Sequence, residues 1–166
     1  YLADGAFFDI GIADVRDTHL SDFAMAALGV GGGHMPLHGR IRLHYDDGIG
    51  GIATSGWRGR SLSLGIADSV TVLAQNAAAA DVAASLIANA ITISSPAITR
   101  QPAASLVLDS DLKDRLVTVD VGPLSADEID QALAAGAGLA RQMCDRGQIM
   151  TAYARLGRRS FVIASE

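Results

Sequence analysis

Residues 77–90 constrain the fold more than any other part of this sequence. The segment is rich in alanine, and Asp81 is its single charged residue. Asn76 stands directly before it, where asparagine is typical of a helix N-cap. A helix that is apolar almost all round must be covered by other elements, so the pattern predicts a buried helix. Because alanine side chains are short, we expect the covering elements to approach it closely.

A second helix and several strands are predicted around this first one. Ser125 and Glu128 have the spacing of a capping box, which predicts a helix from there to about Arg146, with Gly147 as its stop. Gly136 and Gly138 weaken that helix, so we expect close packing at both. A shorter helix is expected at residues 18–28. Alternating apolar residues predict strands at 8–15, 40–45, 69–74, 116–121, 149–155 and 161–164, whereas 49–63 and 97–116 are expected to be loops.

This order of elements predicts an α+β fold, a mixed domain with an antiparallel sheet and two main packed helices. The 166 residues are expected to form a single domain, 1–166. The chain begins at Tyr1 rather than Met, so we expect it to lack an N-terminal portion that is cleaved, truncated or carried on a separate chain. A preceding signal peptide would then lie outside this sequence.

Composition excludes several classes of protein. Hydrophobic residues make up 49% of the chain, which is enough to drive a core and excludes a disordered protein. A net charge of −5 argues against nucleic acid as the partner, and no apolar run is long enough for a membrane span. One cysteine excludes a disulfide framework. Cys144 has no histidine near it in sequence, which favours a core position over a nucleophile. We expect a cytoplasmic protein.

The loop expected at residues 51–63 is the first candidate site. It combines glycines, hydroxyl groups and two arginines with no acid. Glycine lets backbone amides face an anion, and arginine can bind phosphate through two hydrogen bonds. Trp57 could stack on a planar ring; the alternative is a solvated turn with a half-buried tryptophan. The candidate phosphate-binding residues are Thr54, Ser55, Gly56, Arg58 and Arg60.

Asp81 is the second candidate. A lone carboxylate in an alanine helix has to face water, a partner or a metal, because burying it alone is costly. Ser85 follows four residues later and therefore lies on the same face of the helix. A carboxylate and a hydroxyl one turn apart suit Mg²⁺, which binds few protein ligands together with water and phosphate. The alternative is that Asp81 sits in the first helical turn and only complements the helix dipole.

Three short motifs resemble those of a known family. They are residues 51–56 (Gly-Ile-Ala-Thr-Ser-Gly), residues 70–72 (Val-Thr-Val), and Ala80-Asp81 with Ser85 four positions further on. Together they resemble the ApbE-like superfamily, relatives of FAD:protein FMN transferase. Further segments, among them residues 63–72, 109–112, 117–119 and 121–124, are most similar to an uncharacterised cytoplasmic branch of it. The resemblance implies a T-fold-related architecture and a dimer. It also implies that Asp81 and Ser85 hold Mg²⁺ and that Thr54, Ser55 and Gly56 lie near FAD or FMN.

One stretch departs from that family. The transferases carry a His-x-x-Asp-Pro-x-Thr-Gly segment between the two first motifs, whereas residues 57–69 contain neither histidine nor proline. No catalytic residue is therefore assigned. The first hypothesis is a protein that binds a flavin nucleotide or a similar phosphate-bearing ligand with Mg²⁺, with phosphoester, phosphoanhydride or flavin-transfer chemistry. The second is a non-catalytic accessory or structural protein, acting through a homo-oligomer or a separate N-terminal chain.

Overall fold

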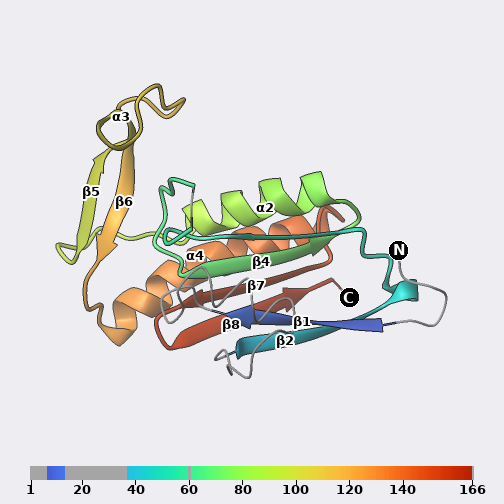
Figure 1. The fold of residues 1–166 in the computed structure, drawn as a ribbon. Coiled ribbons are helices and arrows are strands. Elements are labelled where there is room, and N and C mark those ends of the chain that lie inside the picture. The colour runs from blue at the N-terminus through green and yellow to red at the C-terminus, as the bar shows by residue number, and fades with distance from the viewer. Residues whose placement is uncertain (1–6, 14–36, 60, 166) are drawn as a thin grey trace, which may run out of the picture. The chain divides into compact units, whose positions relative to one another are not determined.

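The computed structural model describes residues 7–13, 37–59 and 61–165, and the chain divides into two compact units, Tyr1–Ile49 and Gly50–Glu166. In the first unit, β1 (Phe7–Ala13) pairs antiparallel with β2 (Leu37–His44), so both predicted strands are present (Figure 1). The 3-10 helix η2 (Tyr45–Asp47) follows, where the His44 amide donates to the Asp47 carboxylate at 2.7 Å. The helix expected at 18–28 lies outside the described residues.

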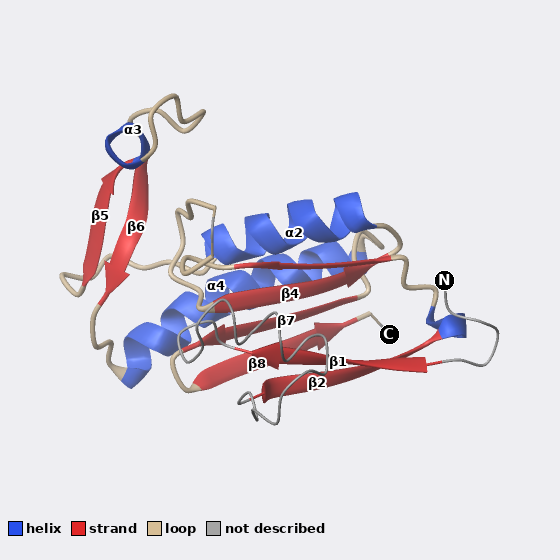
Figure 2. Cartoon of the chain, in the orientation of Figure 1, coloured by secondary structure: helices blue, strands red, loops and turns tan. Residues whose placement is uncertain are grey.

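The second unit is built on a four-stranded antiparallel sheet in the order β3-β4-β7-β8 (Figure 2). Its strands are β3 (Gly51–Ser55), β4 (Ser69–Ala74), β7 (Thr151–Leu156) and β8 (Arg159–Ala164). The prediction that 49–63 is all loop is wrong at β3. A strand of glycine and small side chains is half-buried and shows no clear alternation, so its pairing with β4 is what defines it.

Two main helices, α2 (Ala77–Ala90) and α4 (Ala126–Asp145), pack against this sheet and against each other. Both predicted caps are present: the Asn76 side chain accepts from the Ala79 amide at 2.9 Å, and Ser125 and Glu128 form a capping box. Buried residues of the two helices meet alternate residues of the strands, among them Val70, Val72, Ala152 and Ala154. The α+β class, the antiparallel sheet and the two packed helices are therefore confirmed.

Helix α2 is not buried all round, which corrects the prediction. One side, including Ala80, Ala84 and Ile87, is fully buried, whereas Val82 is 58% exposed and Leu86 is 47% exposed. The sheet and α4 cover one side of the helix, and the short alanines on that side permit the close approach. Among the described residues, no helix is long and apolar enough to cross a membrane.

Gly136 lies where α4 approaches the C-terminal end of α2 closely. A Cβ at this position would collide with Cγ1 of Ile91, a residue that is itself fully buried beyond the end of α2. Gly138, two residues further along α4, has no heavy atom within 4 Å of its Cβ position. The prediction of close packing is thus confirmed at Gly136 and wrong at Gly138.

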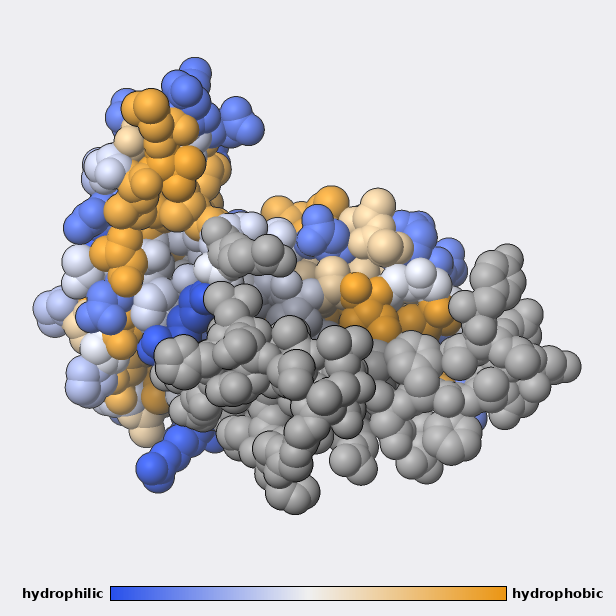
Figure 3. Space-filling view, in the orientation of Figure 1, coloured by the Kyte–Doolittle hydropathy of each residue, from blue (hydrophilic) through white to orange (hydrophobic). Residues whose placement is uncertain are grey.

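A hairpin of β5 (Ile98–Pro102) and β6 (Leu116–Val121), capped by α3 (Ala103–Leu106), projects from the second unit (Figure 1). The prediction of a loop at 97–116 is wrong for β5 and α3, because β5 is mostly polar and exposed and lacks a buried alternating face. We call this hairpin, residues 98–121, the arm. Its tip carries a patch of exposed apolar side chains (Figure 3): Leu106, Val107, Leu108 and Leu116.

Candidate functional site

The loop after β3 is held by its own backbone. A Cβ at Gly56 would collide with the carbonyl of Asp68, so glycine is required there for close approach. The Trp57 amide donates to the Ala67 carbonyl at 3.0 Å, and the Gly59 amide donates to the Gly56 carbonyl at 3.1 Å. These two amides are therefore engaged within the loop, rather than presented to an anion as expected. Arg60, the second predicted arginine, lies outside the described residues.

Arg58 is held between a ring and a carboxylate. Its Cζ lies 4.1 Å from the centroid of the Trp57 ring, and its Nε lies 3.4 Å from Oδ1 of Asp68. The Arg58 side chain is 27% exposed and that of Asp68 only 5%. A guanidinium carries five N–H donors, and this pair uses Nε–H alone. Arg58 is thus fixed in place and retains donors for an anionic group.

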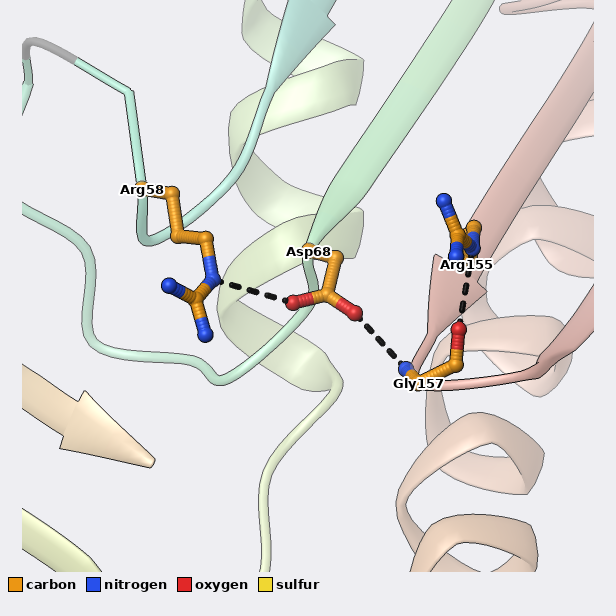
Figure 4. Close-up of polar contacts among 4 residues, drawn as sticks. All are labelled: Arg58, Asp68, Arg155 and Gly157. Carbon is orange, nitrogen blue, oxygen red and sulfur yellow. Dashed lines mark hydrogen bonds and ion pairs between the residues drawn. The ribbon is translucent and has the colours of Figure 1, made fainter. Parts of the chain in front are cut away.

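Asp68 joins this loop to the turn between β7 and β8 (Figure 4). Its second oxygen, Oδ2, accepts from the Gly157 amide at 2.7 Å, while its own amide donates to the Arg155 carbonyl at 2.9 Å. The Arg155 Nε–H closes the turn by donating to the Gly157 carbonyl at 2.9 Å. The sequence did not predict a role for Asp68. Its one indication there is the position of an acid directly before a buried strand.

Asp81 and Ser85 lie on one stripe of α2 with Ala88 and Asn89, since these residues follow the i, i+4, i+7, i+8 pattern of a helix face. Asn89 Oδ1 accepts from the Leu64 amide at 2.9 Å. The Ala88 carbonyl lies so close to the backbone of Gly65 that a Cβ on this glycine would collide with it. The stripe therefore faces the segment at 64–65, which continues the chain beyond β3.

Strand β3 runs alongside α2 in the same direction. The strand starts at Gly51, whose Cβ position would collide with the backbone at the start of the helix, Asn76 and Ala77. A strand rises about 3.4 Å per residue and a helix about 1.5 Å. Ser55 lies roughly 13 Å along the strand from Gly51, and the same distance along the helix from Ala77 reaches a residue near Ser85. Asp81 lies one turn earlier. Ser55 pairs with Val70, which faces the helices.

Thr54 points to the other face of the sheet, because successive side chains of a strand alternate. It is exposed, and its Oγ1 lies 2.9 Å from Oγ1 of Thr71 on the adjacent strand. The sheet thus separates the predicted set: Ser55, Asp81 and Ser85 share the side of the helices, and the Thr54 hydroxyl does not. We call Ser55, Asp81 and Ser85 with the neighbouring Trp57–Arg58 pair the candidate site.

Asp81 is the fifth residue of α2, and no acid lies in the first turn of that helix. The interpretation of Asp81 as a first-turn dipole partner is therefore not supported. Its side chain is exposed and that of Ser85 is half-buried. Within the described ranges, no group of three or more histidine, cysteine, aspartate or glutamate side chains is placed to hold a metal. Asp81 and Ser85 supply a carboxylate and a hydroxyl, the oxygen donor types that Mg²⁺ takes.

Cys144 is a core residue, as the sequence favoured. It is 7% exposed and lies in the cluster between the sheet and the helices. Burial, with a smaller contribution from the Asp145 charge, raises the pKa of its thiol. A thiol with a raised pKa is protonated at neutral pH and is a poor nucleophile.

The fold and the site together define the class of this protein. Its second unit is a two-layer α+β fold in which an edge strand lies beside a nearly uncharged helix. The chain matches the model of the AbpE bacteria family over residues 17–162, and it belongs to that family. No curated protein matches the chain, and no solved structure does.

This finding corrects the resemblance drawn from the motifs. The family that matches is AbpE bacteria, not the ApbE-like superfamily of FAD:protein FMN transferase relatives, so the predicted membership is wrong. Short motifs separated by variable stretches are satisfied by many sequences, whereas the family match is to residues 17–162 as a whole. The roles carried over from that superfamily lose their support, and the candidate site rests on its own geometry.

Proposed function

We propose that this protein binds a flavin nucleotide, or a similar phosphate-bearing ligand with a planar ring, together with Mg²⁺ along the edge formed by β3 and α2. The observation that carries the proposal is Asp81. It is an exposed carboxylate on an otherwise uncharged helix, one turn from the Ser85 hydroxyl and on the side that faces the end of β3.

Mg²⁺ suits this pair of oxygen donors because the ion keeps most of its waters and binds through one or two protein groups plus ligand phosphate. Bound there, it would neutralise phosphate charge and polarise a phosphoryl oxygen. The Ser55 hydroxyl, level with Ser85, would donate to a phosphate oxygen. No acid or base of this chain is assigned to a chemical step.

The Trp57–Arg58 pair supports the ring and the anion of the proposed ligand. Arg58 is pre-positioned by the indole and by Asp68, so little side-chain entropy is lost when its remaining N–H donors bind. Trp57 Nε1 is buried and has no hydrogen-bond acceptor among the described residues. A ligand acceptor near this indole would satisfy a donor whose isolation costs about 1–3 kcal/mol.

The test is titration of the protein with FMN and FAD by isothermal calorimetry, with Mg²⁺ and with EDTA. We expect saturable binding that weakens without Mg²⁺, and at least about tenfold weakening in Asp81→Ala. Asp120→Ala, an exposed acid on β6 in the arm, is the matched control and should bind like the native protein. Equal weakening by both variants would indicate a general charge effect and count against the site.

The second candidate function, a non-catalytic accessory protein, is favoured by one observation, the apolar tip of the arm. Leu108 is 88% exposed and Leu116 is 56% exposed. Exposed apolar patches mark interaction surfaces more often than chance. Under this alternative, we expect the double variant Leu106→Ser with Leu108→Ser to lose the self-association that light scattering detects in the native protein. Neither the native protein nor the double variant should bind flavin.

A further inference from the structure

A groove of about 640 Å³ opens between α4 and the β7–β8 turn, and none of its lining residues belongs to the candidate site. Its apolar lining comes from Leu133 and Phe161, whose side chains pack on the core, and from two alanines of α4. The groove forms because the α4 residues that face β8 include alanines, whose short side chains leave space. Its lining residues are Asp130, Leu133, Ala134, Ala137, Arg158, Arg159, Ser160 and Phe161.

The charges at the rim favour an anion. Arg159 forms an ion pair with Asp130 across the groove, from β8 to α4. Arg158 is exposed beside it and adds a second guanidinium. Two guanidinium groups against one carboxylate leave an excess of one positive charge, in a chain whose net charge is −5.

The turn that carries Arg158 is held rigidly. Gly157 adopts φ +61°, the conformation required at the first central residue of a two-residue hairpin turn. Asp68 accepts from the Gly157 amide, and Arg155 donates to the Gly157 carbonyl. These two hydrogen bonds hold the backbone next to Arg158 in place. Such preorganisation lowers the entropic cost of binding.

We propose that this groove binds a small organic anion, with an apolar ring system against Phe161, Ala134 and Ala137 and one carboxylate or phosphate head at Arg158. The groove is open to solvent, so it would cover one face of such a ring system. A guanidinium can hold either head through two parallel hydrogen bonds. Arg159 is paired with Asp130 through one nitrogen, so Arg158 is the main residue that recognises the head, with the remaining N–H donors of Arg159 beside it.

The experiment titrates the full chain with 2-naphthoate, 2-naphthyl phosphate and neutral 2-naphthol, following probe fluorescence. We expect saturable binding of at least one anion, about tenfold tighter than 2-naphthol. The comparison of the two anions distinguishes a carboxylate head from a phosphate head. Absence of saturable binding of both anions at about millimolar concentration, by folded protein, overturns the proposal.

Matched variants place the bound anion. Arg158→Ala should weaken binding about tenfold, whereas Arg146→Ala, an exposed arginine at the C-terminal cap of α4, should not change it. Ala134→Trp fills the groove and should abolish binding; Ala135→Trp, its exposed neighbour outside the lining, should not. Binding that survives both Arg158→Ala and Ala134→Trp contradicts the assignment.

Discussion

At the scale of single residues, glycines in one helix are distinguished by what lies beside them. Gly136 faces a fully buried isoleucine, Ile91, and Gly138 faces open space. The sequence predicted a weak helix at both positions but could not tell them apart, because the difference lies in a neighbour more than forty residues away in the chain.

The pair gives a matched prediction. Gly138→Ala should raise the free energy of unfolding by about 0.5–1 kcal/mol, because alanine has the better helix propensity and nothing resists its methyl group. Gly136→Ala should lower it by about 1 kcal/mol, because overpacking against Ile91 costs about 1–3 kcal/mol and outweighs the propensity gain. Urea unfolding monitored by circular dichroism measures both, and a stabilised Gly136→Ala would contradict the packing described.

Asp68 gives a second prediction at this scale. Its buried carboxylate accepts from Gly157 and pairs with Arg58. Asp68→Ala should therefore lower the free energy of unfolding by about 2–3 kcal/mol, since it leaves a donor and a guanidinium without their partner. Asp130→Ala, which removes a pair that is half exposed, should cost under about 1 kcal/mol. Equal losses measured by urea unfolding would show that burial of Asp68 does not decide its contribution.

At the scale of elements, segments with strong local signals were predicted well. Strand β4, helix α2 with its asparagine cap, strand β6 and helix α4 with its capping box lie where the sequence indicated. Strands β3 and β5 were missed because their small or polar residues carry no buried alternating face. Those two strands are defined by their partners, which local sequence does not reveal.

The cap of α4 makes a prediction about pH. Hydrogen bonds from the side chain of Ser95, and then from the backbone and side chain of Ser125, hold the pKa of the Glu128 carboxyl below its usual range. A lowered folded-state pKa means that the contribution to stability is complete above the ordinary glutamate pKa of about 4.3 and is lost as pH falls through the folded-state value. The stability difference between native protein and Glu128→Gln should therefore be constant near neutrality and shrink below about pH 4.

The measurement is the urea midpoint of both proteins across that pH range. Asp127→Asn, an exposed acid in the same first turn, is the control for the helix dipole. If the difference in stability between the native protein and Glu128→Gln grew as the pH falls, the lowered pKa of Glu128 would be contradicted.

At the scale of the whole molecule, the chain is a member of the AbpE bacteria family with two compact units. The sequence predicted the class of fold and singled out Asp81 and Ser85, yet it could not show that Ser55 shares their side of the sheet while Thr54 does not. That division depends on the register of β3 against β4. The groove beside Arg158 was not predicted at all, because its residues come from α4 and from the turn between two later strands.

The central claim is Mg²⁺-dependent binding of a phosphate-bearing ligand at Asp81. The most direct measurement is calorimetric titration of native protein and Asp81→Ala with FMN, each with Mg²⁺ and with EDTA. The account predicts saturable binding by the native protein in Mg²⁺, weakened about tenfold or more by EDTA and by Asp81→Ala, with no further effect of EDTA on the variant. Binding that is indifferent to both Mg²⁺ and Asp81, or no binding of FMN or FAD by the folded protein, would contradict it.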